Sequence, residues 1–220
     1  TRPVNELVAG PESQLTYLAL QDLSDESRII QLSHTSVARD ATAKSFILNS
    51  GAAWVRQESL SQLVGENSRS DMLSVSIARD GQEYDQRTFQ HHASAQSYSD
   101  LLYKNTLYDE SRTIFSGLIL VDEKAHQTDA YQTCRNLLMS DTVEANSMPG
   151  LEINADQVKC SHGSTSAMID EDEIFYLRAR GVKPHVARQL VAQGFSVECI
   201  SRLKSPELEE LVLGFAAREF

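Results

Sequence analysis

The chain of 220 residues is poor in the features that mark secreted and membrane proteins. Its three cysteines, Cys134, Cys160 and Cys199, are odd in number and far apart, so the disulfide framework of a small secreted domain is not expected. No apolar run approaches the ~18–20 residues that cross a bilayer, and the opening residues TRPVNELVAG lack the apolar core of a signal peptide. We therefore expect a protein without a membrane span, from a reducing compartment. The missing initiator methionine suggests a fragment of a longer protein.

Positive charge is also in short supply, with 20 Lys and Arg against 31 Asp and Glu and a formal net charge of −11. This balance argues against a nucleic-acid partner and against an anionic membrane surface, and it is most simply a solubility feature. Several catalytic signatures are missing as well. The sequence has no G-x-x-x-x-G-K-[ST] phosphate loop, no G-x-S-x-G nucleophile turn and no zinc-binding H-E-x-x-H. The chain is therefore not expected to hydrolyse ATP through such a loop.

The chain from Leu15 to about Lys159 consists of short apolar and β-branched runs, separated by polar breaks such as GENSRS and RDGQEYD. Such runs are typical of β-strands. They read LTYLAL, RIIQL, SFIL, AAWVRQ, LSVSIA, RTFQHH, TIFSGLILV and LEI. Many short strands in succession indicate a sandwich, a barrel or a solenoid. The pattern does not decide between these three, because no repeat motif can be aligned by eye.

The periodicity changes past residue 169. Asp170 and Glu173 have the D-x-x-E spacing of a capping box, ahead of a helix expected to stop at Gly181. The acidic run from Asp170 to Glu173 also suits a helix N-terminus, because negative charge there complements the helix dipole. We therefore predict two parts, a β-rich body over 1–168 and a small helical region over 169–220.

Three further helical stretches are predicted beyond this first helix. Pro184 is placed as the first residue of the second, which is expected to end at Gly194. The third is expected over 197–203, and the fourth from Ser205–Pro206 onward. Apolar residues at helical spacing predict the buried faces of the second and fourth helices, namely Ala187, Leu190 and Val191, and Leu208, Leu211, Val212 and Phe215.

The stretch VKCSHGST, just before the helical region, places Cys160 and His162 two residues apart. If the stretch is a strand, both side chains lie on one face, about 6.6 Å apart along the chain. A thiolate and an imidazole are both ligands for iron, but two ligands do not complete a zinc or iron–sulfur centre. The rest would come from elsewhere in this chain or from a partner. Alternatively, Cys160 is a small core residue and His162 a hydrogen-bonded turn residue.

Several ordered segments resemble the SufB/SufD iron–sulfur cluster assembly family, and in particular its SufD branch. The longest is GLEINADQVKCSHGSTSAMIDEDEIFYLRARGV, which resembles the hallmark segment of SufD. AHQTDAYQTCRNLLMS, FSGLILV and HASAQSYSDLLYK match in order and spacing, and the similarity extends from roughly Gly51 to Phe195. The SufB branch has an H-E-A-T form where this chain has KCSHGST. It also tends to have a cysteine, tied to cluster formation, where this chain has Val143.

The resemblance implies a right-handed parallel β-helix followed by a C-terminal helical domain, preceded in the family by a further N-terminal region. It implies a non-enzymatic scaffold subunit that pairs with a SufB-like chain and docks SufC, an ATPase of the ABC type. In this family the matching cysteine and histidine face the SufB subunit, so Cys160 and His162 are the expected half of a shared site. A cluster would be held there transiently, and none stably by this chain alone. Bacterial cytoplasm and plastid stroma are the expected compartments.

Other residues are weaker candidates. Cys134 and His92 are the less favoured ligand candidates, and Cys199 is expected to be a packing residue. The family docks SufC on its helical domain, which points to Asp170, Glu171, Asp172, Glu173, Phe175, Tyr176, Arg178 and Arg180. A homodimer of the isolated chain is an open possibility. Two different functions also remain open: a polysaccharide-active β-helix enzyme, with a long groove lined by carboxylates and aromatics, and an interaction module without a metal role.

Overall fold

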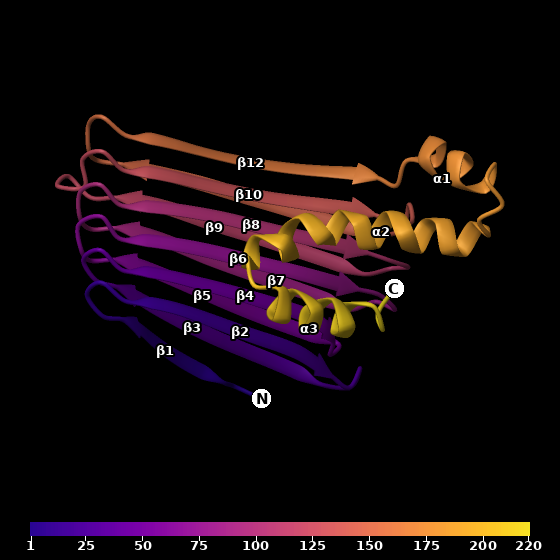
Figure 1. The fold of residues 1–220 in the computed structure, drawn as a ribbon. Coiled ribbons are helices and arrows are strands. Elements are labelled where there is room, and N and C mark those ends of the chain that lie inside the picture. Colours follow the sequence, from indigo (N-terminus) through magenta and orange to yellow (C-terminus); the bar gives the residue numbers. More distant parts are fainter.

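The protein is a solenoid of twelve β-strands followed by a short helical region, in a computed structural model that describes residues 1–220 (Figure 1). Successive strands alternate between two six-stranded sheets, in the orders β1-β3-β5-β7-β9-β11 and β2-β4-β6-β8-β10-β12. Neighbouring strands are parallel, for example β5 with β7 and β6 with β8, and the coil is right-handed. The parallel β-helix implied by the family resemblance is confirmed, and the solenoid is the correct choice among the three all-β architectures.

The strands are longer and more regular than the runs seen in the sequence, and β1, β8 and β10 are absent from the sequence-based assignment. Polar residues explain the gaps, because Lys104, Asn105 and Asn136 occupy buried positions of β8 and β10 and interrupt the apolar pattern. The strand bounds are Val4–Ala9 (β1), Gln14–Leu23 (β2), Arg28–Val37 (β3), Thr42–Gly51 (β4), Trp54–Leu63 (β5), Arg69–Ala78 (β6), Glu83–His92 (β7), Tyr98–Leu107 (β8), Arg112–Val121 (β9), Asp129–Leu138 (β10), Glu144–Ile153 (β11) and Lys159–Met168 (β12).

A repeat is present, at the corner that joins each odd-numbered strand to the next even-numbered one. One residue there has a positive φ of 56–59° in every coil, which is the left-handed conformation. Only glycine, asparagine and aspartate adopt this conformation readily, yet glutamine and glutamate supply four of these positions. The spacing between them is 28, 27, 29, 31 and 30 residues. They are Glu12, Asp40, Asn67, Gln96, Gln127 and Gln157.

The space between the two sheets is lined mainly by buried polar side chains. Hydrogen bonds cross it, from Asn49 Nδ2 to Gln57 Oε1 at 2.6 Å and from Gln86 Nε2 to Ser76 Oγ at 2.9 Å. Buried polar groups of this kind are stable only when paired. The interior of the solenoid therefore combines hydrogen-bonded polar side chains with small apolar clusters, such as the one that contains Leu101, Tyr103 and Phe115.

The largest apolar cluster lies outside the solenoid, between the sheet of even-numbered strands and the helices (Figure 1). Phe46, Leu73 and Leu102 lie in register on three strands and pack against Cys199 and Val212 of the helical region, with other apolar residues around them. Because both faces of this sheet are covered, β6 and β8 are buried almost continuously, whereas β5 and β7 alternate.

The helical region consists of α1 (Glu171–Arg178), α2 (Pro184–Ile200), the 3-10 turn η1 (Ser201–Leu203) and α3 (Pro206–Ala216). The predicted starts are confirmed: the Asp170 carboxylate accepts a 2.8 Å hydrogen bond from the N–H of Asp172, and prolines begin α2 and α3. Gly181, at φ +85°, follows α1 as expected. None of the helices is long and apolar enough to cross a membrane.

Two predictions about the helices are wrong. Gly194 does not end α2, and no separate third α-helix exists, because α2 continues to Ile200 while its buried side packs on β6 and β8. Leu190 and Leu211 do not belong to the buried faces, since each is 46% exposed. The helices instead bury Ala187, Ala192, Ser196 and Val212 among others.

Two lysines of the even-numbered strands, one buried and one half-buried, attach the helical region to the solenoid. Lys104 of β8 is 3% exposed, donates to Phe195 O at 2.7 Å and pairs with Glu198 at 2.5 Å. This hydrogen bond lowers the pKa of Glu198. Lys44 of β4 donates to the carbonyls of Arg202 and Leu203 at 2.8 and 3.0 Å, and burial lowers its pKa. The C-terminal ends of α2 and η1 thus rest on cations from the sheet.

Candidate functional site

The last coil of the solenoid, β11 and β12, presents two strand edges (Figure 1). In the sheets β11 is bonded only to β9, and β12 only to β10. Every residue of β12 except Cys160 is exposed, while the inner side of β11 is partly buried. The hallmark stretch that contains Cys160 and His162 is therefore an edge strand, as the strand interpretation of VKCSHGST requires.

The outer edge of β12 offers unpaired backbone groups at every second residue. In a parallel sheet, alternate residues direct both their N–H and C=O to the same side. The N–H groups of Lys159 and Ile169 donate to Thr128 O and Leu138 O, at 2.8 and 2.9 Å, so odd-numbered residues face β10. The even-numbered residues from Cys160 to Met168 direct their backbone groups outward. An added strand would find these groups without interruption.

The outer edge of β11 is interrupted. Glu144 and Asn154 donate to Ser111 O and Val121 O, at 3.1 and 2.9 Å, so the even-numbered residues of β11 face β9. Pro149 is odd-numbered and its ring nitrogen faces outward, where a proline costs the sheet no hydrogen bond. The same proline leaves a gap in the donors that β11 can offer to another strand.

Register places Cys160 and His162 toward the interior of the solenoid. Cys160 lies over Ala130 and His162 over Gln132, both of which are buried. Residues in register in a parallel sheet share a face, so both site residues point to the open end of the polar interior. Cys160 packs beside the apolar cluster that includes Ala130, and burial raises the pKa of its thiol. His162 is exposed and makes no hydrogen bond.

This pair can supply two ligands to a metal ion or to one edge of a small cluster. Nowhere in the chain do three or more His, Cys, Asp or Glu side chains converge in a way that could hold a metal ion. A cysteine thiolate and a histidine imidazole are the ligand types that iron–sulfur centres accept. The geometry of this chain alone therefore provides half of a four-ligand set.

The other two ligand candidates lie deeper and apart from this pair. Cys134 is fully buried one coil below Ser164, and burial raises the pKa of its thiol to about 12. His92 is fully buried, contacts Ser97 Oγ and Ser99 Oγ at 2.7 and 2.8 Å, and has its pKa lowered to about 4 by burial. Both have the environment of interior packing residues. Cys199 is buried against the sheet, as expected.

The predicted docking residues gather on α1, at the far end of the helical region from α3 (Figure 1). Phe175 and Tyr176 are 69% and 56% exposed. Arg180 covers the Tyr176 ring at 3.4 Å, and Glu171 pairs with Arg188 at 2.7 Å. Only Ile174 of α1 is buried. All eight predicted residues are exposed, namely Asp170, Glu171, Asp172, Glu173, Phe175, Tyr176, Arg178 and Arg180.

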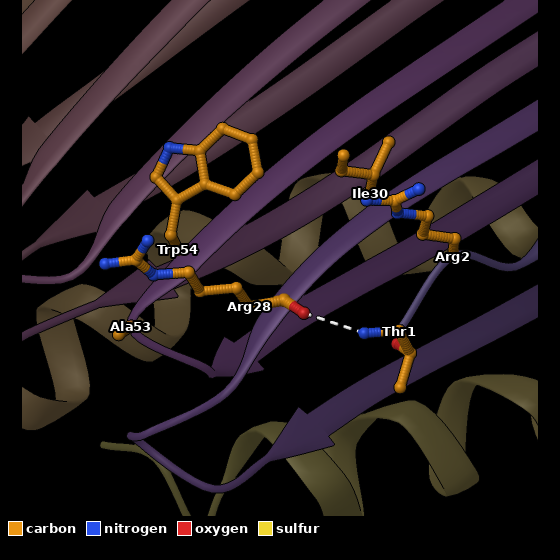
Figure 2. A pocket seen from close by; sticks show the side chains of 6 residues that line it. All are labelled: Thr1, Arg2, Arg28, Ile30, Ala53 and Trp54. Carbon is orange, nitrogen blue, oxygen red and sulfur yellow. Dashed lines mark hydrogen bonds between the residues drawn. The ribbon is translucent and has the colours of Figure 1, made fainter.

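The polysaccharide-active alternative requires a groove with carboxylates and aromatics. A pocket of about 620 Å³ is lined by residues at the N-terminus and at the starts of β3 and β5 (Figure 2), at the opposite end of the solenoid from β12. Trp54 and Ile30 project into it beside Arg28, whose carbonyl accepts from the Thr1 amino group at 2.8 Å. It has no carboxylate among its lining residues. This pocket offers no acid–base pair for glycoside hydrolysis.

A stacked carboxylate pair, Asp71 and Asp100, does occur on the outer face of β6 and β8. Both members are engaged in ion pairs, Asp71 with Arg69 at 2.8 Å and Asp100 with Arg202 at 2.7 Å. Burial raises the pKa of Asp100. Of the two, Asp100 joins the sheet to the helical region through Arg202, whereas the partner of Asp71 belongs to its own strand. Neither this pair nor the pocket at Trp54 favours the enzyme alternative.

Sequence comparisons agree with this geometry. Residues 1–195 match the family described as SUF system FeS cluster assembly, SufBD core domain. The iron–sulfur cluster assembly protein SufD of Escherichia coli (strain K12) is 39% identical over 177 residues, covering 80% of this chain and 42% of that protein. A SufBD family protein of Mycobacterium tuberculosis (strain CDC 1551 / Oshkosh) is 30% identical over 213 residues, covering 93% and 54%.

A plant relative is also similar: the chloroplastic protein ABCI7 of Arabidopsis thaliana is 26% identical over 211 residues, covering 96% of this chain and 44% of that protein. The chain thus spans about half the length of the curated relatives that it matches. The family match covers most of the chain, including the strand that carries Cys160 and His162. The chain belongs to the SufBD family of SUF-system iron–sulfur cluster assembly proteins and is a SufD-like member of it.

Proposed function

We propose that this chain is a non-enzymatic scaffold subunit of a SUF-type assembly, which pairs through β11 and β12 with a SufB-like chain. One observation carries the proposal: the open end of the solenoid places an unpaired ten-residue strand edge beside Cys160 and His162. A partner strand added there would bring its own side chains over the same opening. One partner chain could therefore both pair with the strand edge and supply the ligands that this chain lacks.

Backbone pairing explains how such a partner would be held. Exposed, uninterrupted edges are templates for another strand, and soluble proteins usually protect them. The outward residues of β12 include no proline and no lysine, whereas β11 has Pro149 in its middle. We expect most of the interchain backbone hydrogen bonds to form along β12, with β11 contributing mainly side-chain contacts.

The cluster is the cargo of this site, and Cys160 and His162 would contribute two of its ligands. Because burial raises the pKa of the Cys160 thiol, the thiol is protonated at neutral pH in the free chain. Iron binding would displace that proton, which makes uptake at this site favourable with rising pH. The partner would supply the remaining ligands and close the site from water.

The helical region provides the second docking surface of the proposal. Phe175 and Tyr176 form an exposed aromatic pair, flanked by Asp172, Glu173 and Arg180. Large exposed aromatics with a charged rim are typical of protein interfaces. We assign this surface to the SufC-type ATPase, and the cytoplasm or the plastid stroma as the compartment, in line with the bacterial and chloroplastic relatives.

The decisive experiment is anaerobic cluster reconstitution on the chain co-purified with a SufB-like partner and SufC, followed by visible absorption. Cys160→Ala and His162→Ala are each expected to lower the cluster band while leaving the complex intact. His185→Ala serves as the control, because this histidine is exposed on α2 and not on the solenoid. If the complex is stable and neither site substitution changes the absorption band of the cluster, the chain is an interaction module without a ligand role. Failure to co-purify would contradict the pairing itself.

A further inference from the structure

A buried glutamine beneath the candidate site has no hydrogen-bond partner. Gln132 of β10 is 1% exposed, yet neither its Oε1 nor its Nε2 is paired. Leaving one buried polar atom unpaired costs on the order of 1–3 kcal/mol, so two such atoms in one amide require an explanation. A functional role is one explanation for a buried polar group without a hydrogen-bond partner.

Two polar side chains around this amide are themselves without a partner, one above it in the stack and one across the interior. Below Gln132 in the stack lies Leu101, which is apolar, and above it lies His162. Across the interior is Gly117, and a Cβ built there would lie 2.4 Å from Gln132 Oε1 and 2.6 Å from Thr88 Oγ1. These two oxygens therefore face the same small space. Thr88 Oγ1 is buried and unpaired as well.

We propose that Gln132 is a positioning residue for His162. The oxygen and nitrogen of a glutamine amide are assigned from their partners and exchange on a half turn. In one orientation Nε2 donates to Thr88 Oγ1 and Oε1 accepts from one ring N–H of His162. The other ring nitrogen is then unprotonated and directed at the open end, where iron would bind. The inference rests on the proposed role of His162 as a ligand.

The arrangement follows a general requirement of histidine ligands. A metal-binding imidazole usually donates its second N–H to an oxygen, which sets both the tautomer and the ring orientation. The exposed ring of His162 is free to form this bond, because no side-chain group of the chain is paired with it. Gly117 gives the amide its room, because any side chain there would occupy the space that Gln132 and Thr88 share.

The first test is the imidazole tautomer of His162, measured by nitrogen-15 NMR of the histidine-labelled chain at pH 8. His162 is expected to hold a single N–H tautomer, whereas the exposed His185 shows the mixture of a free imidazole. Gln132→Met, of similar shape, should give His162 the same mixture. Gln132→Glu keeps an acceptor oxygen and should preserve the single tautomer. Gln86→Met is the matched control, since Gln86 is equally buried but belongs to another sheet and coil.

The second test is cluster yield in the complex with a SufB-like partner. Gln132→Met is expected to lower iron binding about 10-fold, the usual lower bound for losing such a partner, and Gln132→Glu to restore it. If His162→Ala lowers the yield but Gln132→Met does not, the inference fails and the proposed function stands. If His162→Ala has no effect, the ligand role fails, and the tautomer measurement still decides the hydrogen bond. A tautomer mixture at His162 in the unsubstituted chain overturns the inference even where Gln132→Met does not fold.

Discussion

Burial inside the solenoid changes the protonation of individual polar residues, and His92 is the clearest case. Its ring is fully buried between Ser97 and Ser99, and burial lowers its pKa to about 4, against about 6.5 when unfolded. Between pH 6.5 and 4, the His92 ring is therefore protonated in the unfolded state but mostly neutral in the folded state. Stability attributable to the neutral ring is complete above pH 6.5 and is lost as the pH falls from 6.5 to 4.

This linkage gives a measurable slope. Between pH 6.5 and 4, His92 should remove on the order of 3 kcal/mol from the free energy of unfolding, at up to 1.4 kcal/mol per pH unit. Urea unfolding at a series of pH values should show that His92→Asn is less stable than the unsubstituted chain at pH 7, with the difference shrinking by pH 4. His126→Asn, at an exposed histidine, should follow the unsubstituted chain throughout. A constant difference at all pH values would disprove the assignment.

The three thiols should differ sharply in reactivity. Cys134 and Cys199 are fully buried and burial raises the pKa of each to about 12, whereas Cys160 lies half-exposed at the open end. A thiol reagent at pH 8 should label one cysteine of the native chain and all three after unfolding, with mass spectrometry locating the first at Cys160. Labelling should accelerate with rising pH, since burial raises the pKa of Cys160 too. Native labelling at Cys134 or Cys199 would contradict the buried environment of these thiols.

Among individual residues, the sequence predicts the two members of the VKCSHGST motif but not the buried residues around them. Cys160 and His162 stand out because their spacing suits one face of a strand and their segment resembles a family. Gln132 and Thr88 give no such signal, because a lone glutamine or threonine in a sequence normally indicates a surface position. Their burial follows from the register of β7, β9 and β10, which no local pattern contains.

Among the elements, β12 is the edge strand through which the proposed function pairs this chain with another. Its even-numbered residues direct their backbone outward, so Ser164→Pro removes one outward donor and leaves the ladder to β10 intact. Ser164→Ala is the matched control, because it loses the hydroxyl and keeps the N–H. We expect Ser164→Pro to weaken binding of a SufB-like partner about tenfold or more, since one hydrogen bond and the ring's bulk together exceed about 1.4 kcal/mol.

Titration of the partner by calorimetry would measure this difference, with thermal unfolding of the isolated chain as the test of folding. The unfolding midpoints of Ser164→Pro and Ser164→Ala should stay close to each other. Equal affinities of the two variants would show that the partner does not pair with the backbone of β12.

Element boundaries were harder to predict than element types. The N-terminal signals of α1, α2 and α3 are local side-chain effects, and all three hold. Gly194 carried a stop signal that tertiary packing overrides, because the turn beyond it buries Ser196, Cys199 and Ile200 against the sheet. The recurring left-handed corner, from Glu12 to Gln157, gives no signal in the sequence because none of its six residues is glycine.

For the whole molecule, the main question is whether the helical region and the solenoid behave as one body. They share the largest apolar cluster, and the buried cation of Lys104 joins them through Phe195 O and Glu198. Glu198 also meets Arg135 at 3.2 Å, but Arg135 is 45% exposed, and its pair with Glu198 is a surface one. Arg202 also reaches Glu198, at 4.0 Å, so three cations surround this carboxylate, and of these only Lys104 is buried.

This contrast provides the last prediction. Lys104→Met should lower the free energy of unfolding by about 1–3 kcal/mol, because it removes a charged donor from buried acceptors, while Arg135→Met should cost less than about 1 kcal/mol. Hydrogen exchange should locate the loss, with faster exchange of the α2 amides from Ala192 to Ile200 and unchanged exchange in β5 and β7. If the two variants lose equal stability, or if exchange quickens evenly through the solenoid, then Lys104 does not join the helical region to the sheet. A selective effect on α2 would mean that the C-terminal half of α2 can loosen while the sheet that holds β5 and β7 stays in place.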